Sequence, residues 1–118
     1  NMVRLTEFEK TVITLLCESV LSADVLENIL KSDCEFKYDY TGTGYYISIY
    51  NDGLPKKEMV CDKPFVHGKN NFTGETESGF VIFLKNNSLT FECYNLFEDI
   101  FPEDYRSQPV VIEASDKI

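Results

Sequence analysis

Catalysis by an acid, a base or a nucleophile needs particular side chains within reach of one another, and this sequence offers few candidates. His67 is the single histidine, and no serine or cysteine is spaced to serve as its nucleophile. Glu92 lies between Phe91 and Cys93, so alternation leaves its face of a strand undecided. A solvent-facing carboxylate explains Glu92, and a structural or surface role explains His67. We expect no catalytic residues, and a hydrolase that uses Glu92 or His67 stays as a rival hypothesis.

The cysteines and glycines give no metal or cofactor motif. Cys17, Cys34, Cys61 and Cys93 contain no CxxC spacing and do not cluster with the histidine, which disfavours a metal site. No glycine-rich loop precedes a helix or a Lys-Ser/Thr pair, so phosphate-loop and dinucleotide fingerprints are missing from the sequence. We expect no metal, no cofactor and reduced, structural cysteines.

The charge balance narrows the class of partner. The 118 residues carry 20 Asp and Glu against 11 Lys and Arg, a formal charge of -9. This charge repels phosphate backbones and anionic lipid, so we expect neither nucleic acid nor a membrane as a partner. Simple solubility is one explanation of the acidity, and steering toward a basic protein is the other. No segment has the residue pattern of a signal peptide or of a membrane span, so we expect a cytoplasmic protein.

The segment 91–104 combines five acidic residues with four aromatic residues and contains no Lys or Arg. Aromatic anchors ringed by carboxylates suit a surface for a basic protein. Alternatively, the rings face the core and only the acids face water. Glu35, Asp39 and the loop 62–78 form a second acidic region that could bind instead. The predicted partner-binding residues are Tyr94, Phe97, Glu98, Asp99, Phe101, Glu103, Asp104 and Tyr105.

Helical periodicity fills the first third of the chain. Thr6 followed by Glu9 is a capping-box pattern, and apolar residues then recur at three-to-four spacing, which predicts a helix over 7–20. Ser22 offers a second N-cap, and the next apolar face predicts a helix that ends near Lys31. Whether the two form a helical hairpin or one bent element stays open.

After the helices the period changes to two, which is typical of strands. Turn chemistry at 41–44 and at Asn86-Asn87 predicts two hairpins. The polar, glycine-containing stretch 62–78 is predicted to be a loop, and 115–118 a loose tail. Strands are predicted at 34–40, 45–50, 58–61, 80–84, 89–94 and 110–112.

Helices first and strands afterwards predict an α+β fold in one domain, 1–118. A helical hairpin at about 6–31 would pack on an antiparallel sheet of about five to six strands at about 34–114. An apolar pocket between helices and sheet would make the chain a small ligand-binding or regulatory domain, which is the alternative function.

Three segments resemble known proteins: TGTGYYISIY at 41–50, ESGFVIFLKNNSLTFECYN at 77–95 and FPEDYR at 101–106. They resemble small bacterial domains that include immunity proteins of toxin systems, among them contact-dependent growth-inhibition systems. The resemblance implies a cytoplasmic antidote that binds and blocks a cognate toxin, commonly a nuclease with a basic cleft. Acidity, size and the missing catalytic motifs agree with this implication, so the leading hypothesis is an immunity-type inhibitor.

Overall fold

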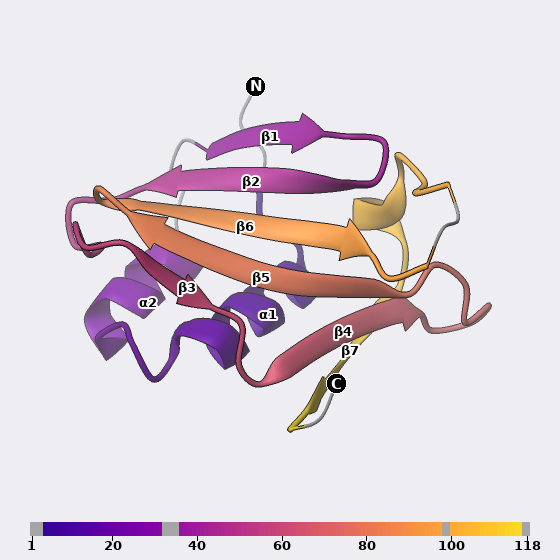
Figure 1. Ribbon diagram of the computed structural model, residues 1–118, viewed down its shortest axis with the longest axis horizontal. Helices are drawn as coiled ribbons and strands as arrows, with labels where there is room; N and C mark the ends of the chain where they lie inside the picture. Colours follow the sequence, from indigo (N-terminus) through magenta and orange to yellow (C-terminus); the bar gives the residue numbers. More distant parts are fainter. Residues whose placement is uncertain (1–3, 32–35, 98–99, 117–118) are drawn as a thin grey trace.

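The computed structural model describes residues 4–31, 36–97 and 100–116, which form a helical layer against one sheet (Figure 1). Both α-helices precede the strands, and a short 3-10 helix, η1 (Tyr105–Ser107), precedes the last strand. This order confirms the predicted α+β fold with antiparallel strands. The elements are α1 (Glu7–Cys17), α2 (Ala23–Lys31), β1 (Phe36–Tyr40), β2 (Gly44–Tyr50), β3 (Met59–Cys61), β4 (Phe65–Asn70), β5 (Ser78–Lys85), β6 (Ser88–Asn95) and β7 (Val110–Ser115).

The predicted capping box begins α1. The Thr6 hydroxyl accepts a hydrogen bond from the backbone N–H of Glu9 at 3.3 Å, and the Glu9 carboxylate accepts one from the backbone N–H of Thr6 at 2.8 Å. The helix ends at Cys17 rather than near residue 20. The backbone N–H groups of Val20 and Leu21 both donate to the Cys17 carbonyl and close a turn there.

The second helix follows its prediction at both ends. The Ser22 hydroxyl accepts a hydrogen bond from the backbone N–H of Val25 at 3.3 Å, so it caps α2. The helix ends at Lys31. A turn separates α1 from α2, and the two are distinct helices rather than one bent element.

The sheet has the order β1-β2-β6-β5-β4-β7, and every pair is antiparallel. The short strand β3 pairs with the second half of β5, beside the β4 pairing. Both predicted hairpin turns are confirmed. The backbone N–H of Thr41 donates to the Gly44 carbonyl at 3.0 Å. Asn86 and Asn87 have φ angles of 50° and 61°, the left-handed conformation that a tight hairpin needs.

The prediction of a loop over 62–78 is wrong for β4, which pairs with β7 along its whole length. Gly68 interrupts the alternation of apolar and polar residues that predicts a strand, because it occupies an inward position where an apolar side chain is expected. A Cβ at Gly68 would come within 3.0 Å of side-chain atoms of Ile112 and Val110. The predicted tail is also shorter, since Ser115 belongs to β7 and residues 117–118 lie outside the described part.

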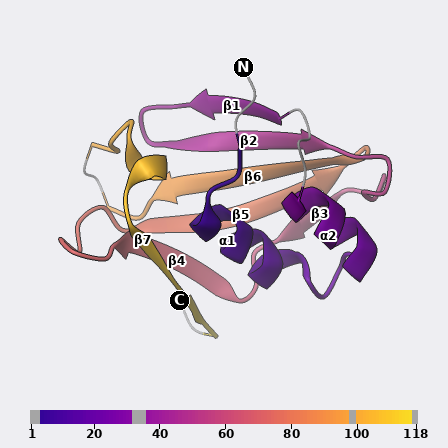
Figure 2. The same ribbon diagram turned by 180° about the vertical axis from the view of Figure 1, so that it is seen from behind.

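The helices cover one face of the sheet, and α1 lies against β5, β4 and β7 (Figure 2). Side chains of both layers meet there and exclude water. The space where an apolar ligand would lie is therefore occupied by the core. Its most deeply buried apolar residues include Val12, Ile13, Leu16, Ile29, Tyr45, Ile47, Ile49, Ile82, Leu84, Leu89 and Phe91.

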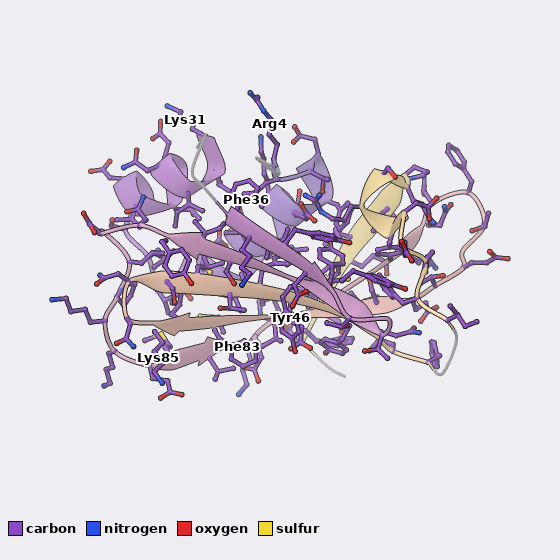
Figure 3. The ribbon with its side chains drawn as sticks, turned by 90° about the horizontal axis from the view of Figure 1, so that it is seen from above. Arg4, Lys31, Phe36, Tyr46, Phe83 and Lys85 are labelled. Atoms are coloured by element: carbon purple, nitrogen blue, oxygen red, sulfur yellow. The ribbon has the colours of Figure 1, made fainter. Side chains whose placement is uncertain are left out.

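Among the residues that the structure describes, no helix lies over the other face of the sheet. Seen from above, the helices lie on one side of the strands, and Tyr46, Phe83 and Lys85 project from the other (Figure 3). This face is mixed in character: Phe83 is 38% exposed, and the Tyr46 hydroxyl donates to the Glu92 carboxylate at 3.1 Å. Antiparallel sheets commonly leave such a face in water.

Candidate protein-binding surface

The predicted interface includes two aromatic rings that the structure places in the core. Phe101 is 1% exposed and Tyr105 is 0% exposed, and their ring centroids lie 4.8 Å apart. The Tyr105 hydroxyl lies 2.9 Å from the Ser78 hydroxyl and donates to the Thr76 carbonyl at 3.1 Å, so its polar atom is satisfied internally. Phe101 and Tyr105 are therefore corrected from partner-binding residues to core residues.

Tyr94 belongs to the uncovered face of the sheet. It is half-buried, and its ring covers Gly79 on the neighbouring strand. A Cβ at Gly79 would come within 2.4 Å of this ring, so the glycine makes room for the aromatic side chain. Packing on its own sheet explains Tyr94 without a partner.

The remaining predicted residues lie in the segment that follows β6. Phe97 is 60% exposed, and Glu103 and Asp104 are exposed in the turn before η1. Glu98 and Asp99 lie outside the described residues. Of the predicted aromatic anchors in the described part, Phe97 is the one that projects into solvent.

Phe97 lines a hollow between two loops. The described parts of these loops lie at one end of the sheet, at the right in Figure 1. One loop, 71–77, connects β4 to β5, and the other, 96–104, follows β6. The backbone N–H of Leu96 donates to the Glu77 carbonyl at 3.0 Å and joins the two. The hollow is open to solvent and has a volume of about 470 Å³. We name it the acidic hollow, and its lining residues are Gly74, Glu75, Thr76, Glu77, Phe97 and Ile100.

Apolar and acidic side chains share this end of the molecule. Ile100 is 90% exposed, and Phe72, from the same loop as Glu75 and Glu77, is 83% exposed. Neither 71–77 nor 96–104 contains a lysine or an arginine. The surface therefore offers apolar area inside a field of negative charge.

The 71–77 loop is held by Asn70 at the end of β4. The Asn70 side-chain oxygen accepts hydrogen bonds from the backbone N–H groups of Phe72 and Thr73 at 2.9 and 3.1 Å. Its side-chain nitrogen donates to the Gln108 side chain at 3.0 Å. Thr76 has a φ of 53°, which is unusual for a β-branched residue. A defined hydrogen-bond pattern therefore fixes the loop that lines the hollow.

A buried ion pair fixes the chain that follows the acidic segment. Glu9 is 0% exposed, and its carboxylate accepts hydrogen bonds from Arg106 Nε at 2.7 Å and Arg106 Nη2 at 2.8 Å. The Tyr45 hydroxyl donates to the same carboxylate at 2.6 Å. Through these contacts α1, β2 and η1 are tied together at one point, so the 100–104 segment is anchored to the core.

This network has the charge states of a structural ion pair. Burial acts to lower the pKa of Arg106, but the hydrogen bonds and charge of Glu9 outweigh it and raise the pKa. Burial and the Glu9 charge both raise the pKa of Tyr45. The guanidinium group also lies over the Tyr38 ring, 5.3 Å from its centroid. Arg106 is thus a fixed cation and Tyr45 a fixed hydrogen-bond donor.

Sequence reasoning missed most of this arrangement. The sequence around Glu9 predicts its role in helix capping but not its ion pair, because the partner Arg106 lies 97 positions away. Ile100 is missed because one exposed isoleucine has no spacing signal. Glu75 and Glu77 fall within the loop 62–78 that the sequence marks as a second acidic region. The signal that could have found the hollow is the lack of any base in both loops.

The two rival catalytic candidates lie apart, on β4 and β6, with β5 between them. The Glu92 carboxylate accepts the Tyr46 hydroxyl, as described above. His67 Nε2 lies 3.8 Å from a Glu113 carboxylate oxygen, and its ring stacks on Phe65. These contacts agree with surface roles for both.

Cys17, Cys61 and Cys93 carry free thiols and are buried. Burial is the main cause that raises the pKa of each of these thiols. They behave as small apolar residues. Cys34 lies outside the described residues.

The described ranges, 4–31, 36–97 and 100–116, hold no group of three or more His, Cys, Asp or Glu side chains that could bind a metal ion. They also hold no helix that is both long and apolar enough to cross a membrane.

Comparison with protein-family models, with curated proteins and with solved structures found no match to this chain. The acidic hollow is the candidate binding surface of this chain.

Proposed function

We propose that this protein is an immunity-type inhibitor that binds a basic toxin protein through the acidic hollow and through Glu103 and Asp104, exposed acids of the segment that follows β6. One observation carries the proposal: Phe97 and Ile100 are 60% and 90% exposed in a hollow lined by Glu75 and Glu77. Single exposed apolar residues are common in proteins. Apolar side chains gathered in a hollow and rimmed by charge are typical of protein interaction sites.

The charge of the chain supports a basic partner. A net charge of -9 attracts a cationic protein over distances longer than direct contact, and carboxylates at the hollow give that attraction a direction. Electrostatic steering of this kind can raise association rates by roughly 10- to 1,000-fold at low salt. Fast binding suits an antidote, because the toxin must be blocked before it acts.

Inhibition would follow from occlusion. A toxin that acts on a polyanion has a basic cleft, and an acidic, partly apolar surface placed over that cleft excludes the substrate. The resemblance of 41–50, 77–95 and 101–106 to immunity proteins supports the same class of partner. No residue of this protein needs to take part in chemistry for such an inhibitor to work.

The test of this function is co-purification with the product of the adjacent upstream gene. We expect a stable complex and loss of that product's toxicity when both proteins are present. The proposal fails if the neighbour is not toxic and does not bind.

A charge-reversal variant tests the surface. Replacing Glu103 and Asp104 by lysine should lower the association rate by roughly tenfold at low salt and by less at moderate salt. The matched control reverses Asp52 and Glu58, two exposed acids in the loop between β2 and β3, at the other end of the sheet (Figure 1). Equal effects of the two variants would show that net charge, and not this surface, drives binding.

A further inference from the structure

We infer that the acidic hollow receives an arginine or lysine side chain of the partner, with its aliphatic stem on Phe97 and Ile100 and its cation at Glu75 and Glu77. This inference rests on the proposed function and adds the chemistry of the contact. It identifies a subsite for one cationic side chain inside the larger interface.

The shape of the hollow suits a projecting side chain. Its volume of about 470 Å³ falls within the roughly 300–1,000 Å³ of small-ligand sites, but it is open rather than enclosed. An open hollow between two loops admits a side chain that remains attached to a folded partner. A free small molecule would keep much of its surface in water there.

The apolar side chains supply a surface for the stem of such a residue. Lysine and arginine bury their methylene groups along apolar surface while the charged end stays polar. The exposed ring of Phe97 can also attract the cation itself, since a cation over an aromatic face is favourable. Arginine fits best, because its planar group stacks on a ring and donates hydrogen bonds in its own plane.

The carboxylates supply a charge that the described part of the chain leaves uncompensated. Within residues 4–31, 36–97 and 100–116, the ion pairs join Lys10 to Glu7, Lys31 to Glu27, His67 to Glu113 and Arg106 to Glu9. Arg106 is the nearest cation in sequence to the 96–104 loop, and it is already paired with Glu9. Glu75 and Glu77 have no base in their own loop. A cation from outside would complete the charge pattern.

The experiment is a titration of the isotope-labelled protein, followed by NMR, with the peptide acetyl-Leu-Arg-Leu-amide. Its neutral counterpart carries citrulline in place of arginine. We expect the arginine peptide to shift the backbone signals of 74–77, Phe97 and Ile100, and the citrulline peptide to do so at least several-fold more weakly. The inference is overturned if the two peptides bind alike or if the shifts map elsewhere.

Glutamine variants provide the matched test. Glu75→Gln and Glu77→Gln should each weaken binding of the arginine peptide by about two- to fivefold, the range of an exposed ion pair. Glu58→Gln makes the same change of net charge at the other end of the sheet and should leave binding unchanged. Phe97→Leu keeps apolar area but removes the ring, so a further loss of affinity identifies the stacking contribution.

The outcomes separate this inference from the proposed function. If the upstream gene product binds and Glu75→Gln with Glu77→Gln leaves its affinity unchanged, the cationic subsite is overturned while the inhibitor function stands. If the arginine peptide binds in the hollow but the upstream product does not co-purify, the subsite stands and the inhibitor function falls.

Discussion

Glu9 is a charged residue inside the core, and four hydrogen bonds explain how the fold accommodates it. One comes from the backbone of Thr6, one from Tyr45 and two from Arg106. Each carboxylate oxygen therefore has donors, which removes the penalty of an unsatisfied buried charge. The same residue caps α1 and fixes η1, so a local helix signal and a long-range ion pair coincide in one side chain.

Replacing Arg106 by methionine should lower the free energy of unfolding by about 3–5 kcal/mol, because the Glu9 carboxylate would stay buried without its cation. Chemical unfolding monitored by circular dichroism measures the change. The control is Lys31→Met, which removes the exposed partner of Glu27 and should change the free energy of unfolding very little. Similar losses for the two variants would contradict a structural role for the buried pair.

At the scale of elements, local patterns were enough for the start of α1, for α2 and for both hairpins. Capping residues, the change of period and turn asparagines act within a few positions of one another. The strand β4 could not be predicted, because Gly68 and His67 break the apolar alternation and its pairing partner β7 comes much later in the chain. The acidic hollow shares this difficulty. Its two loops meet through the order of the strands, and sequence alone did not give that order.

Replacing Gly68 by valine tests the packing of β4. The new side chain would meet Ile112, Val110 and Phe80, and should lower the free energy of unfolding by about 1–3 kcal/mol through overpacking. Lys69→Val places the same side chain on the opposite face of the strand, where valine suits a strand and the cost should be near zero. Equal costs in thermal unfolding would contradict the inward position of Gly68.

At the scale of the whole molecule, one face of the sheet is closed by helices, one is open, and the acidic hollow lies at one end. The core between the helices and the sheet contains two buried tyrosines, Tyr45 and Tyr105, as well as aliphatic residues. Burial is the main cause of a raised pKa for both residues. It raises the pKa of Tyr45, and it raises the pKa of Tyr105 to about 12. The folded protein therefore keeps protons that the unfolded chain loses above about pH 10.

This difference in bound protons between the folded and unfolded states predicts that the protein loses stability at alkaline pH. Because the unfolded state binds fewer protons above about pH 10, the free energy of unfolding should fall as pH rises, by up to about 1.4 kcal/mol per pH unit for each buried tyrosine. Urea unfolding from about pH 8 to about pH 11 measures the slope. Tyr105→Phe should make the slope shallower, whereas Tyr50→Phe, at a position 65% exposed, should not. A slope that Tyr105→Phe leaves unchanged would contradict the assignment.

The separation between Glu9 and Arg106 has a kinetic consequence. During synthesis α1 emerges long before η1, and for that time the Glu9 carboxylate keeps water as its partner. Formation of the Glu9–Arg106 ion pair then requires 97 residues of chain to be closed into one loop, which is slow because distant contacts form late. We expect α1 to join the sheet in a late, concerted step of folding, with the hairpin of β5 and β6 formed before it.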